Sequence, residues 1–551
     1  MDTRPNFLLF VTDQHRADLL GCAGHAQVRT PHIDALAAGG ARFEQFHVAT
    51  PICQPNRASL MTGRLPSAHG LQMNGRELSL GESTFVEQLR EAGWRTALAG
   101  KSHLQNITAV APPWPAAGQR LPQDASRPYP GRYGQEVGRR WEEDPGWELD
   151  LPYYGFERVA LSIGHGDEQQ GHWRRWLRAQ LPPGEADRLI GPANAIPTPG
   201  LALGALGQAW RTRVPEDLYP TAWIAQQTCA MLAEFAQGAQ GTSGEQGGPP
   251  FFLQCSFPDP HHPFTPPGRY WDLFRPEDIP LPETFAAEGV NPPPALAWLR
   301  AQRSAHPGFK PGFGAFACSA QEAREAQALH HGSLACIDDA VGQVMAQLRA
   351  LGLDGNTVVM FTADHGELLG ERGLMFKGGL HYDALTRVPF IWRDTAQSPD
   401  MKASQGGRER AAPAGRVVDA LAQTTDIAAT VLARAGLLPA NGMHGRSLLP
   451  VLQGEVQEVR EALLVEEESQ RADFGMDRRV RMRTLRTHQH RLTFYDGQPW
   501  GELYDLQADP KELRNLWSAP AAQAVRSELM ERLARAMLEA ADTSPYPTAS
   551  A

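Results

Sequence analysis

Polar side chains that suit metal binding follow two apolar runs far apart in the chain, Phe7–Thr12 and Thr357–Thr362. The candidate ligands are Asp13, Gln14, Cys53, Asp364 and His365. Two carboxylates, an amide oxygen and an imidazole, with the side chain at position 53, suffice for one divalent cation. An oxygen-rich ligand set suits Ca²⁺, the ion that we expect first, or Mg²⁺ or Mn²⁺. The imidazole ligand favours Mn²⁺. Taken alone, Asp13 is better explained as the cap of the next turn.

A second group of side chains could hold an anion and move protons: Lys101, His103, His261 and Lys377. Lys101 and His103 follow the strand-like run Thr96–Ala99 and face the same way in extended chain. His261 stands in a proline-locked turn, rigid enough for general acid catalysis near neutral pH. Lys377 could offer a second cation. Alone, Lys101 and His103 are better explained by a surface lysine beside a hydrogen-bonded histidine.

The run Pro51–Arg64 places Cys53, Pro55 and Arg57 in the order C-x-P-x-R. Short motifs match by chance, and alone this one equally fits a buried structural thiol beside a proline turn and a solvated arginine. Its interpretation therefore depends on the rest of the chain.

Alternating strand and helix patterns must position these side chains. The expected strands are Phe7–Thr12, Thr96–Ala99, Phe251–Phe257 and Thr357–Thr362. The expected helices are Pro31–Gly39, one opening near Cys53, Ser83–Gly93, Ala222–Ala236 and Ala320–Leu351. This alternation predicts an α/β fold with a large mixed, mostly parallel sheet sandwiched by helices. Open sheets of this kind place their sites at the carboxyl ends of the strands.

The chain is long enough for one large domain and a smaller one. We expect the large domain over residues 1–450, with an irregular Trp-rich excursion at about 111–216. Residues 451–551 read as an α+β subdomain. Its Arg-rich segments Arg481–Thr487 and Arg491–Tyr495 predict a small antiparallel sheet, closed by a helix over Ala522–Ala541.

Composition narrows the classes of partner and the compartment. The formal net charge of −10 in 551 residues, with no Lys/Arg cluster, argues against nucleic-acid binding. An anionic substrate would need locally placed cations. No apolar run is long enough for a membrane span or a signal peptide, and the six cysteines show no zinc or disulfide spacing. We expect a cytoplasmic protein and leave a homo-oligomer open.

In this order, the segments resemble the landmarks of the type I, formylglycine-dependent sulfatases of the alkaline-phosphatase-like superfamily. The matching elements are the N-terminal strand with its Asp, C-x-P-x-R-A-S-L-x-T-G, G-K-x-H, P-H-x-P-F, D-H-G-E and the K…R-V-P stretch. The run Gly501–Leu506, with Asp509-Pro510 and Asn515-Leu516, is similar to their closing segment. The resemblance covers nearly the whole chain apart from the Trp-rich region.

The resemblance implies that a formylglycine-generating maturation enzyme oxidises Cys53, and that the aldehyde hydrate attacks sulfur and then expels sulfate. Metal coordination and Arg57 would activate the hydrate, while the cation, Lys101 and Lys377 hold the sulfate oxygens. His261 with Lys377 would protonate the leaving oxygen, and His103 would deprotonate the remaining hydroxyl. Further implied or candidate substrate contacts are Asn74, Lys101, His165, His172, His261 and Lys377.

Two positions depart from many sulfatases, because Gln14 stands where a second Asp is common and His365 where Asn is common. This version also occurs in phosphonate monoester hydrolases, which tend to lack the Lys and His of G-K-x-H. Lys101 and His103 therefore favour a small-molecule or carbohydrate sulfate ester, with phosphonate monoester or phosphodiester hydrolysis as the alternative. A two-metal phosphatase with a Ser or Thr nucleophile and a non-catalytic scaffold protein fit the residues less well.

Overall fold

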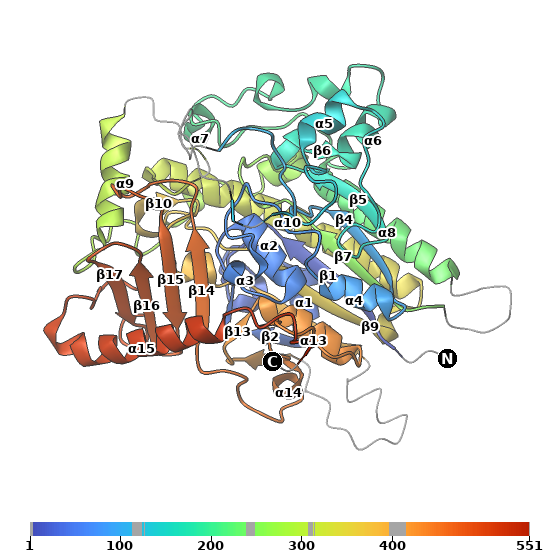
Figure 1. Cartoon of the computed structure of the whole chain (residues 1–551). Helices are drawn as coiled ribbons and strands as arrows, with labels where there is room; N and C mark the ends of the chain where they lie inside the picture. The colour runs from blue at the N-terminus through green and yellow to red at the C-terminus, as the bar shows by residue number, and fades with distance from the viewer. Residues whose placement is uncertain are drawn as a thin grey trace.

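The computed structural model describes residues 4–112, 124–125, 127–238, 248–306, 312, 314–395 and 415–549. Within these ranges, nine strands form one sheet through the middle of the molecule (Figure 1). In sheet order they are β12 (Arg416–Val418), β2 (Ala41–Phe43), β11 (Phe390–Asp394), β9 (Thr357–Ala363), β1 (Asn6–Thr12), β7 (Phe251–Ser256), β4 (Arg95–Gly100), β5 (Arg158–Ile163) and β6 (Gln170–Gly171). The expected mostly parallel α/β sheet is confirmed.

The central strands run parallel and in a register that aligns their carboxyl ends. β1 pairs in parallel with β9 and β7, β7 with β4, and β4 with β5, whereas β11 and β6 are antiparallel to their neighbours. Thr12 lies opposite Ala363, and Gly100 lies opposite both Ser256 and Leu161. Residues that follow these strands therefore meet at one edge of the sheet.

Helices cover both faces of the sheet, so the central strands are buried on both sides. One face packs on α1 (Pro31–Ala38), α8 (Pro220–Gly238) and α10 (Ala320–Ala350), and the other on α2 (Cys53–Thr62), α4 (Phe85–Glu91) and α13 (Thr425–Arg434). In β1, Leu8 and Phe10 face the first layer, while Phe7 and Leu9 face the second. Alternate side chains of one strand thus hold the two helix layers together.

Local signals start these helices where the sequence places them. Ser319 and Glu322 form a reciprocal capping box at the start of α10, and Thr84 accepts a hydrogen bond from the main-chain nitrogen of Glu87 in α4. Pro55 is tolerated in α2 because the first turn needs no main-chain donor there. The helix at the C-x-P-x-R run therefore begins at Cys53 itself.

The C-terminal part carries the expected smaller sheet. Its strands are β14 (Leu463–Glu468), β15 (Arg481–Arg486), β16 (His490–Tyr495) and β17 (Gly501–Asp505), all antiparallel, with α15 (Gln523–Glu539) against one face. The opposite face packs on the segment that follows Lys377, where Tyr495 and Tyr504 join Leu380 and Tyr382 in one apolar cluster. The two sheets are therefore connected through a segment next to the candidate site.

The segment 111–216 is more regular than its composition predicts, although residues 113–123 and 126 lie outside the described ranges. It contributes β5 and β6 to the large sheet and the helices α5 (Gly138–Glu143) and α6 (His172–Gln180). β5 is only six residues long and is flanked by glycine-rich turns at Gly155 and Gly164.

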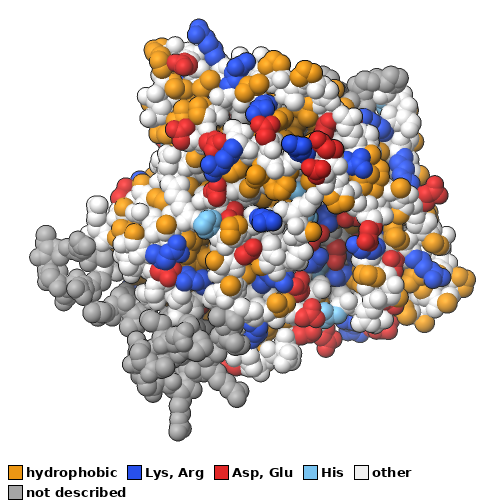
Figure 2. All heavy atoms as spheres, turned by 180° about the vertical axis from the view of Figure 1, so that it is seen from behind, with side chains coloured by type: hydrophobic (Ala, Val, Ile, Leu, Met, Phe, Trp, Pro, Cys, Tyr) orange, Lys and Arg blue, Asp and Glu red, His pale blue; other side chains and the backbone are white. Residues whose placement is uncertain are grey.

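The surface carries charges of both signs. On the face shown in Figure 2, Lys and Arg side chains are interspersed with Asp and Glu side chains and with apolar patches. Among the residues that the structure describes, none of the helices combines the length and the hydropathy that crossing a bilayer requires.

Candidate active site

The predicted site residues come together at the carboxyl edge of the large sheet. Each central strand ends just before one or more of them, and the helix α2 adds Cys53 and Arg57 from one face. In sheet order the strand-end residues are Asp364 and His365 after β9, Asp13 and Gln14 after β1, His261 after β7, and Lys101 and His103 after β4. Parallel register brings these distant segments to one place.

Four buried side chains converge tightly enough to share a metal ion. Asp13, Cys53, Asp364 and His365 each offer one ligand atom, and these atoms all lie within 4.8 Å of one another. His365 Nε2 is 3.3 Å from Asp13 Oδ1 and 3.5 Å from Asp364 Oδ1. Among the described residues, Asp13 Oδ1 makes no well-aligned hydrogen bond, although His365 Nε2 lies near it. A buried carboxylate oxygen of this kind, inside an oxygen, nitrogen and sulfur donor set, fits one divalent cation.

Gln14 is held by both ends of its amide. Its Nε2 donates to Glu367 and, at 3.1 Å, to Nδ1 of His262, so its Oε1 is left to accept from Lys377 Nζ at 3.0 Å. The main-chain nitrogen of Gln14 donates to Asp364 Oδ1 at 3.1 Å. Glu367 thus sets which amide atom faces the site, and the ligand role of Gln14 stays a prediction.

Two cations neutralise the two aspartates. Arg57 Nε donates to Asp364 Oδ2 at 2.8 Å, and its Nη1 donates to Ser256 Oγ at 2.9 Å. The Lys101 ammonium donates to Asp13 Oδ2. Burial alone would raise the pKa of Asp13, but the charge of the adjacent Lys101 is the main influence against it, and that pKa lies well below its ordinary value. Asp13 is therefore ionised and ready to bind a cation.

Cys53 is the first residue of α2 and is only 2% exposed. Burial would raise its pKa, but the positive charges of Lys377 and His365 lower it below the ordinary thiol value. Burial and Lys377 would lower the pKa of His365, yet Asp364, Cys53 and Asp13 raise it to about 10. In the unmodified chain, these two directions favour a thiolate paired with an imidazolium.

Lys377 and His261 form a second polar pair. Lys377 Nζ lies 2.8 Å from His261 Nε2, and His261 Nδ1 contacts the carbonyl oxygen of His262. Burial, together with the neighbouring His165 and Lys377, lowers the pKa of His261 well below its ordinary value. The neutral His261 ring therefore accepts a hydrogen bond from Lys377 at Nε2, and Lys377 is the donor of the pair.

A family model described as sulfatase matches residues 5–136 and 207–437 of this chain. The chain belongs to the sulfatase family. A second model, described as the C-terminal part of N-sulphoglucosamine sulphohydrolase, matches residues 409–539. Membership places the chain in the alkaline-phosphatase-like superfamily and makes it a sulfuric ester hydrolase, as the sequence motifs predict.

Curated relatives and a solved structure match over nearly the full length. The arylsulfatase of Clostridium perfringens is 24% identical over 530 residues, covering 93% of this chain and 90% of the relative. The ulvan-active sulfatase of Formosa agariphila is 25% identical over 544 residues, covering 98% and 82%. The phosphonate monoester hydrolase of Agrobacterium radiobacter superposes with a TM-score of 0.72 at 26% identity, covering 98% and 96%.

The remaining candidate residues of the sulfatase site differ in where they lie. His103 is buried, and its Nδ1 has no hydrogen-bond partner among the described residues. Burial and the charges of Lys101 and Arg57 lower the pKa of His103 well below the ordinary value. Asn74 is half-buried beside residue 53, since its Oδ1 accepts from the main-chain nitrogen of Gln54 at 3.2 Å.

The two candidate histidines of the Trp-rich segment lie in different places. His165 lies inside the site, 2.7 Å from Lys101 Nζ and stacked on His261. His172 begins α6, where its ring accepts from the main-chain nitrogen of Leu161 at 2.8 Å and contacts Glu148 at 2.8 Å. The contacts of His172 are thus with its own segment, and we do not assign it to the substrate pocket. Trp173 is buried in the apolar core and serves packing.

Sequence reasoning missed several supporting residues. Glu367 was visible in the D-H-G-E motif but had no role until its contact with Gln14 was known. Glu136 accepts main-chain hydrogen bonds from residues 103–105 and so fixes the loop of His103. No local pattern marks Glu136, because its partners lie about thirty residues away. Gln14, His103 and Phe376 all have positive φ, and such strained backbone is typical of functional sites.

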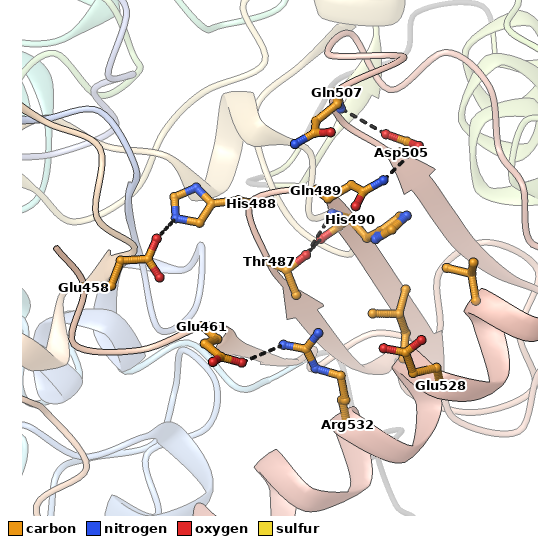
Figure 3. Close-up of a pocket in the computed structure, with 12 residues that line it drawn as sticks. Glu458, Glu461, Thr487, His488, Gln489, His490, Asp505, Gln507, Glu528 and Arg532 are labelled. Carbon is orange, nitrogen blue, oxygen red and sulfur yellow. Dashed lines mark hydrogen bonds and ion pairs between the residues drawn. The ribbon is translucent and has the colours of Figure 1, made fainter.

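A separate groove of about 690 Å³ lies between α15 and the β15–β16 hairpin (Figure 3). Its lining contains two ion pairs, with Glu458 2.7 Å from His488 and Glu461 4.0 Å from Arg532. It contains none of the predicted site residues. This groove is therefore separate from the sheet edge where the candidate residues meet.

Proposed function

We propose that this sulfatase hydrolyses a sulfate monoester to an alcohol or phenol and inorganic sulfate, using a formylglycine made from Cys53. The convergence of Asp13, Cys53, Asp364 and His365 within 4.8 Å, with the Lys101 and Lys377 ammonium groups close by, carries this proposal. Anion-binding lysines beside a nucleophile position and a cation site match the needs of a sulfate ester.

Two groups would be added to the encoded chain. A formylglycine hydrate at position 53 supplies one hydroxyl for attack on sulfur and a second whose deprotonation releases the sulfate. A divalent cation supplies charge stabilisation at the sulfate oxygens. Asp13, Asp364 and His365 would hold the cation with the side chain of residue 53, and Gln14 would join them through its oxygen. The carboxylates favour Ca²⁺ first, with Mn²⁺ and Mg²⁺ as alternatives.

The chain's own cations bind and orient the ester. Lys101 follows β4 and Lys377 follows β10 (Leu374–Met375), and each ammonium group is fixed by a neighbouring acceptor close to the nucleophile position. Both ammonium groups would bind sulfate oxygens, and their low exposure strengthens that attraction. Arg57 is committed to Asp364 and Ser256, and so orients the site rather than the ester.

Protons move at two atoms. The Lys377–His261 pair would deliver a proton to the leaving oxygen, because the Lys377 ammonium can pass a proton to Nε2 of the neutral His261 ring, which then donates it. His103 would take a proton from residue 53, since its ring is neutral and its Nδ1 lacks a partner among the described residues. Both steps use neutral imidazoles held in a buried site.

The alternative is a phosphonate monoester or phosphodiester hydrolase on the same scaffold, which the similarity to the Agrobacterium radiobacter hydrolase supports. The sulfatase family match and the presence of Lys101 and His103 favour sulfate. The substrate class remains a small-molecule or carbohydrate sulfate ester, with aryl and alkyl esters both included.

The deciding experiment produces the chain together with a formylglycine-generating enzyme and measures an aryl sulfate and a phenylphosphonate monoester side by side. We expect the peptide with residue 53 to have lost mass by exchange of CH₂–SH for CHO, and kcat/KM to be higher for the sulfate. A retained thiol in protein that turns over would contradict the formylglycine, and faster turnover of the phosphonate would establish the alternative.

A further inference from the structure

His165 comes from outside the part of the chain that the sulfatase model matches. That model matches residues 5–136 and 207–437, whereas His165 follows β5 in the intervening segment. β5 lies beside β4 and parallel to it, so its carboxyl end joins the same edge of the sheet as Lys101. The segment between the matched blocks therefore adds one more strand end to the active site.

The backbone around His165 is built for close approach. Gly164 and Gly166 flank it, both with positive φ, which side chains with a Cβ rarely adopt. A Cβ at Gly166 would lie 3.0 Å from Thr265 Oγ1 and 3.1 Å from the carbonyl oxygen of Pro263. Glycine at 166 thus lets the turn press against the segment that carries His261.

The imidazole of His165 makes one polar and one stacking contact with the catalytic set. Lys101 Nζ lies 2.7 Å from Nε2, and an ammonium can only donate, so Nε2 accepts and the ring proton sits on Nδ1. The ring also stacks on His261, with centroids 3.7 Å apart and planes 15° from parallel. His261 is held from its other side by His262, at 4.1 Å.

The same contacts argue against a second metal ion at this place. Asp13, His165 and His261 bring three ligand atoms within 4.8 Å of one another. However, the Lys101 ammonium already donates to both Asp13 and His165. A second metal ion would have to displace Lys101. Asp13 and His165 are therefore better interpreted as acceptors for the Lys101 ammonium group than as metal ligands at this place.

We propose that His165 is a positioning residue that aims Lys101 at the sulfate and fixes the ring plane of His261 toward the leaving oxygen. This inference rests on the proposed sulfate-ester function. The His165 side chain is 12% exposed, whereas Lys101 is 1% exposed and His261 2% exposed. His165 therefore contacts Lys101 and His261 from the outer side of the site. On the inner side, Asp13 contacts Lys101 and Lys377 contacts His261.

Two substitutions separate the two contacts. His165→Phe keeps a flat ring for stacking but removes the acceptor for Lys101. We expect kcat/KM to fall about tenfold or more for all sulfate esters alike, the size expected for loss of a hydrogen bond to a charged group. His165→Gln keeps an acceptor but removes the ring. We expect its losses to grow with the pKa of the leaving group, because His261 is then less well aimed.

The matched controls are His172→Phe and His172→Gln, which change a histidine of the same segment that contacts Leu161 and Glu148 instead of the site. These variants should keep the wild-type kcat/KM and the wild-type leaving-group dependence. Thermal unfolding of all four variants, measured on matured enzyme, separates loss of the fold from mispositioning of Lys101 and His261.

A double-mutant cycle tests the route through Lys101. In a Lys101→Ala background, His165→Phe should cost nothing further, since the contact it removes is already gone. Additive losses would overturn the proposal, as would His165 variants that match the His172 controls or that lose activity only in proportion to unfolding. If Lys101→Ala itself hydrolyses sulfate esters at the wild-type rate, the proposed function fails instead.

Discussion

His365 Nε2 lies 3.2 Å from the Sγ of Cys53, and both side chains are buried. The two residues stand 312 positions apart, one at the end of β9 and the other at the start of α2. Their contact joins the proposed nucleophile position to the proposed cation ligands. Changes at position 53 should therefore affect both turnover and metal binding.

Replacement of Cys53 tests the hydrate directly. Cys53→Ala should abolish turnover, because no nucleophile remains. Cys53→Ser can attack sulfur but cannot eliminate the sulfate, so we expect a single burst followed by a trapped sulfo-enzyme that mass spectrometry detects. Steady turnover of Cys53→Ser at the wild-type rate would exclude the hydrate mechanism.

Asp364→Ala should lower bound metal to well under one equivalent, because Asp364 is a predicted ligand and the partner of Arg57. Chelation should lower the melting temperature of the wild type but not of this variant, since a ligand stabilises only a chain that binds it. Asp505→Ala removes an acidic side chain from the groove of Figure 3, which contains none of the predicted site residues, and serves as the control. Full metal occupancy in Asp364→Ala would refute the assignment.

The Lys377–His261 pair should matter most for esters whose alcohol leaves poorly. An acidic phenol departs as its anion, whereas an alkyl alcohol needs a proton, and general acid catalysis typically contributes about 10²–10⁴-fold. His261→Ala should therefore steepen the dependence of kcat on leaving-group pKa.

Lys377→Ala should steepen it too, and the double variant should lose less than the sum, because the two nitrogens are 2.8 Å apart. Equal losses across a phenol series, with the chemical step rate-limiting, would reassign His261 to binding.

Asp259 should make the stability of the fold depend on pH. Burial raises the pKa of its carboxyl from 3.8 to about 7, although hydrogen bonds from Thr221 and Tyr219 act against this. Between these values the folded chain binds a proton that the unfolded chain has released, so the free energy of unfolding falls as pH rises. Asp259→Asn imitates the protonated group and should flatten this decline. Denaturant unfolding at several pH values compares the two; parallel curves for wild type and variant would show that Asp259 does not cause it.

The sequence by itself predicted the residues of the candidate site and determined which element types hold them. Apolar runs that end in Asp13 and Asp364 are local signals, and so is the proline in the first turn of α2. The α/β class and the antiparallel C-terminal sheet also follow from patterns within a few residues of each element. Periodicity is sufficient for these conclusions because each element forms from its own neighbours in the chain.

Only the tertiary structure decided which side chains meet. His165 and His172 stand in the same segment and look alike in sequence, yet only His165 contacts Lys101. The difference arises because β5 joins β4 in parallel, a pairing that depends on strand order in the sheet. The orientation of the Gln14 amide likewise depends on Glu367, which lies 353 residues away. The strand order and such hydrogen bonds between distant residues are established only when the whole chain packs. No local sequence pattern can therefore predict them.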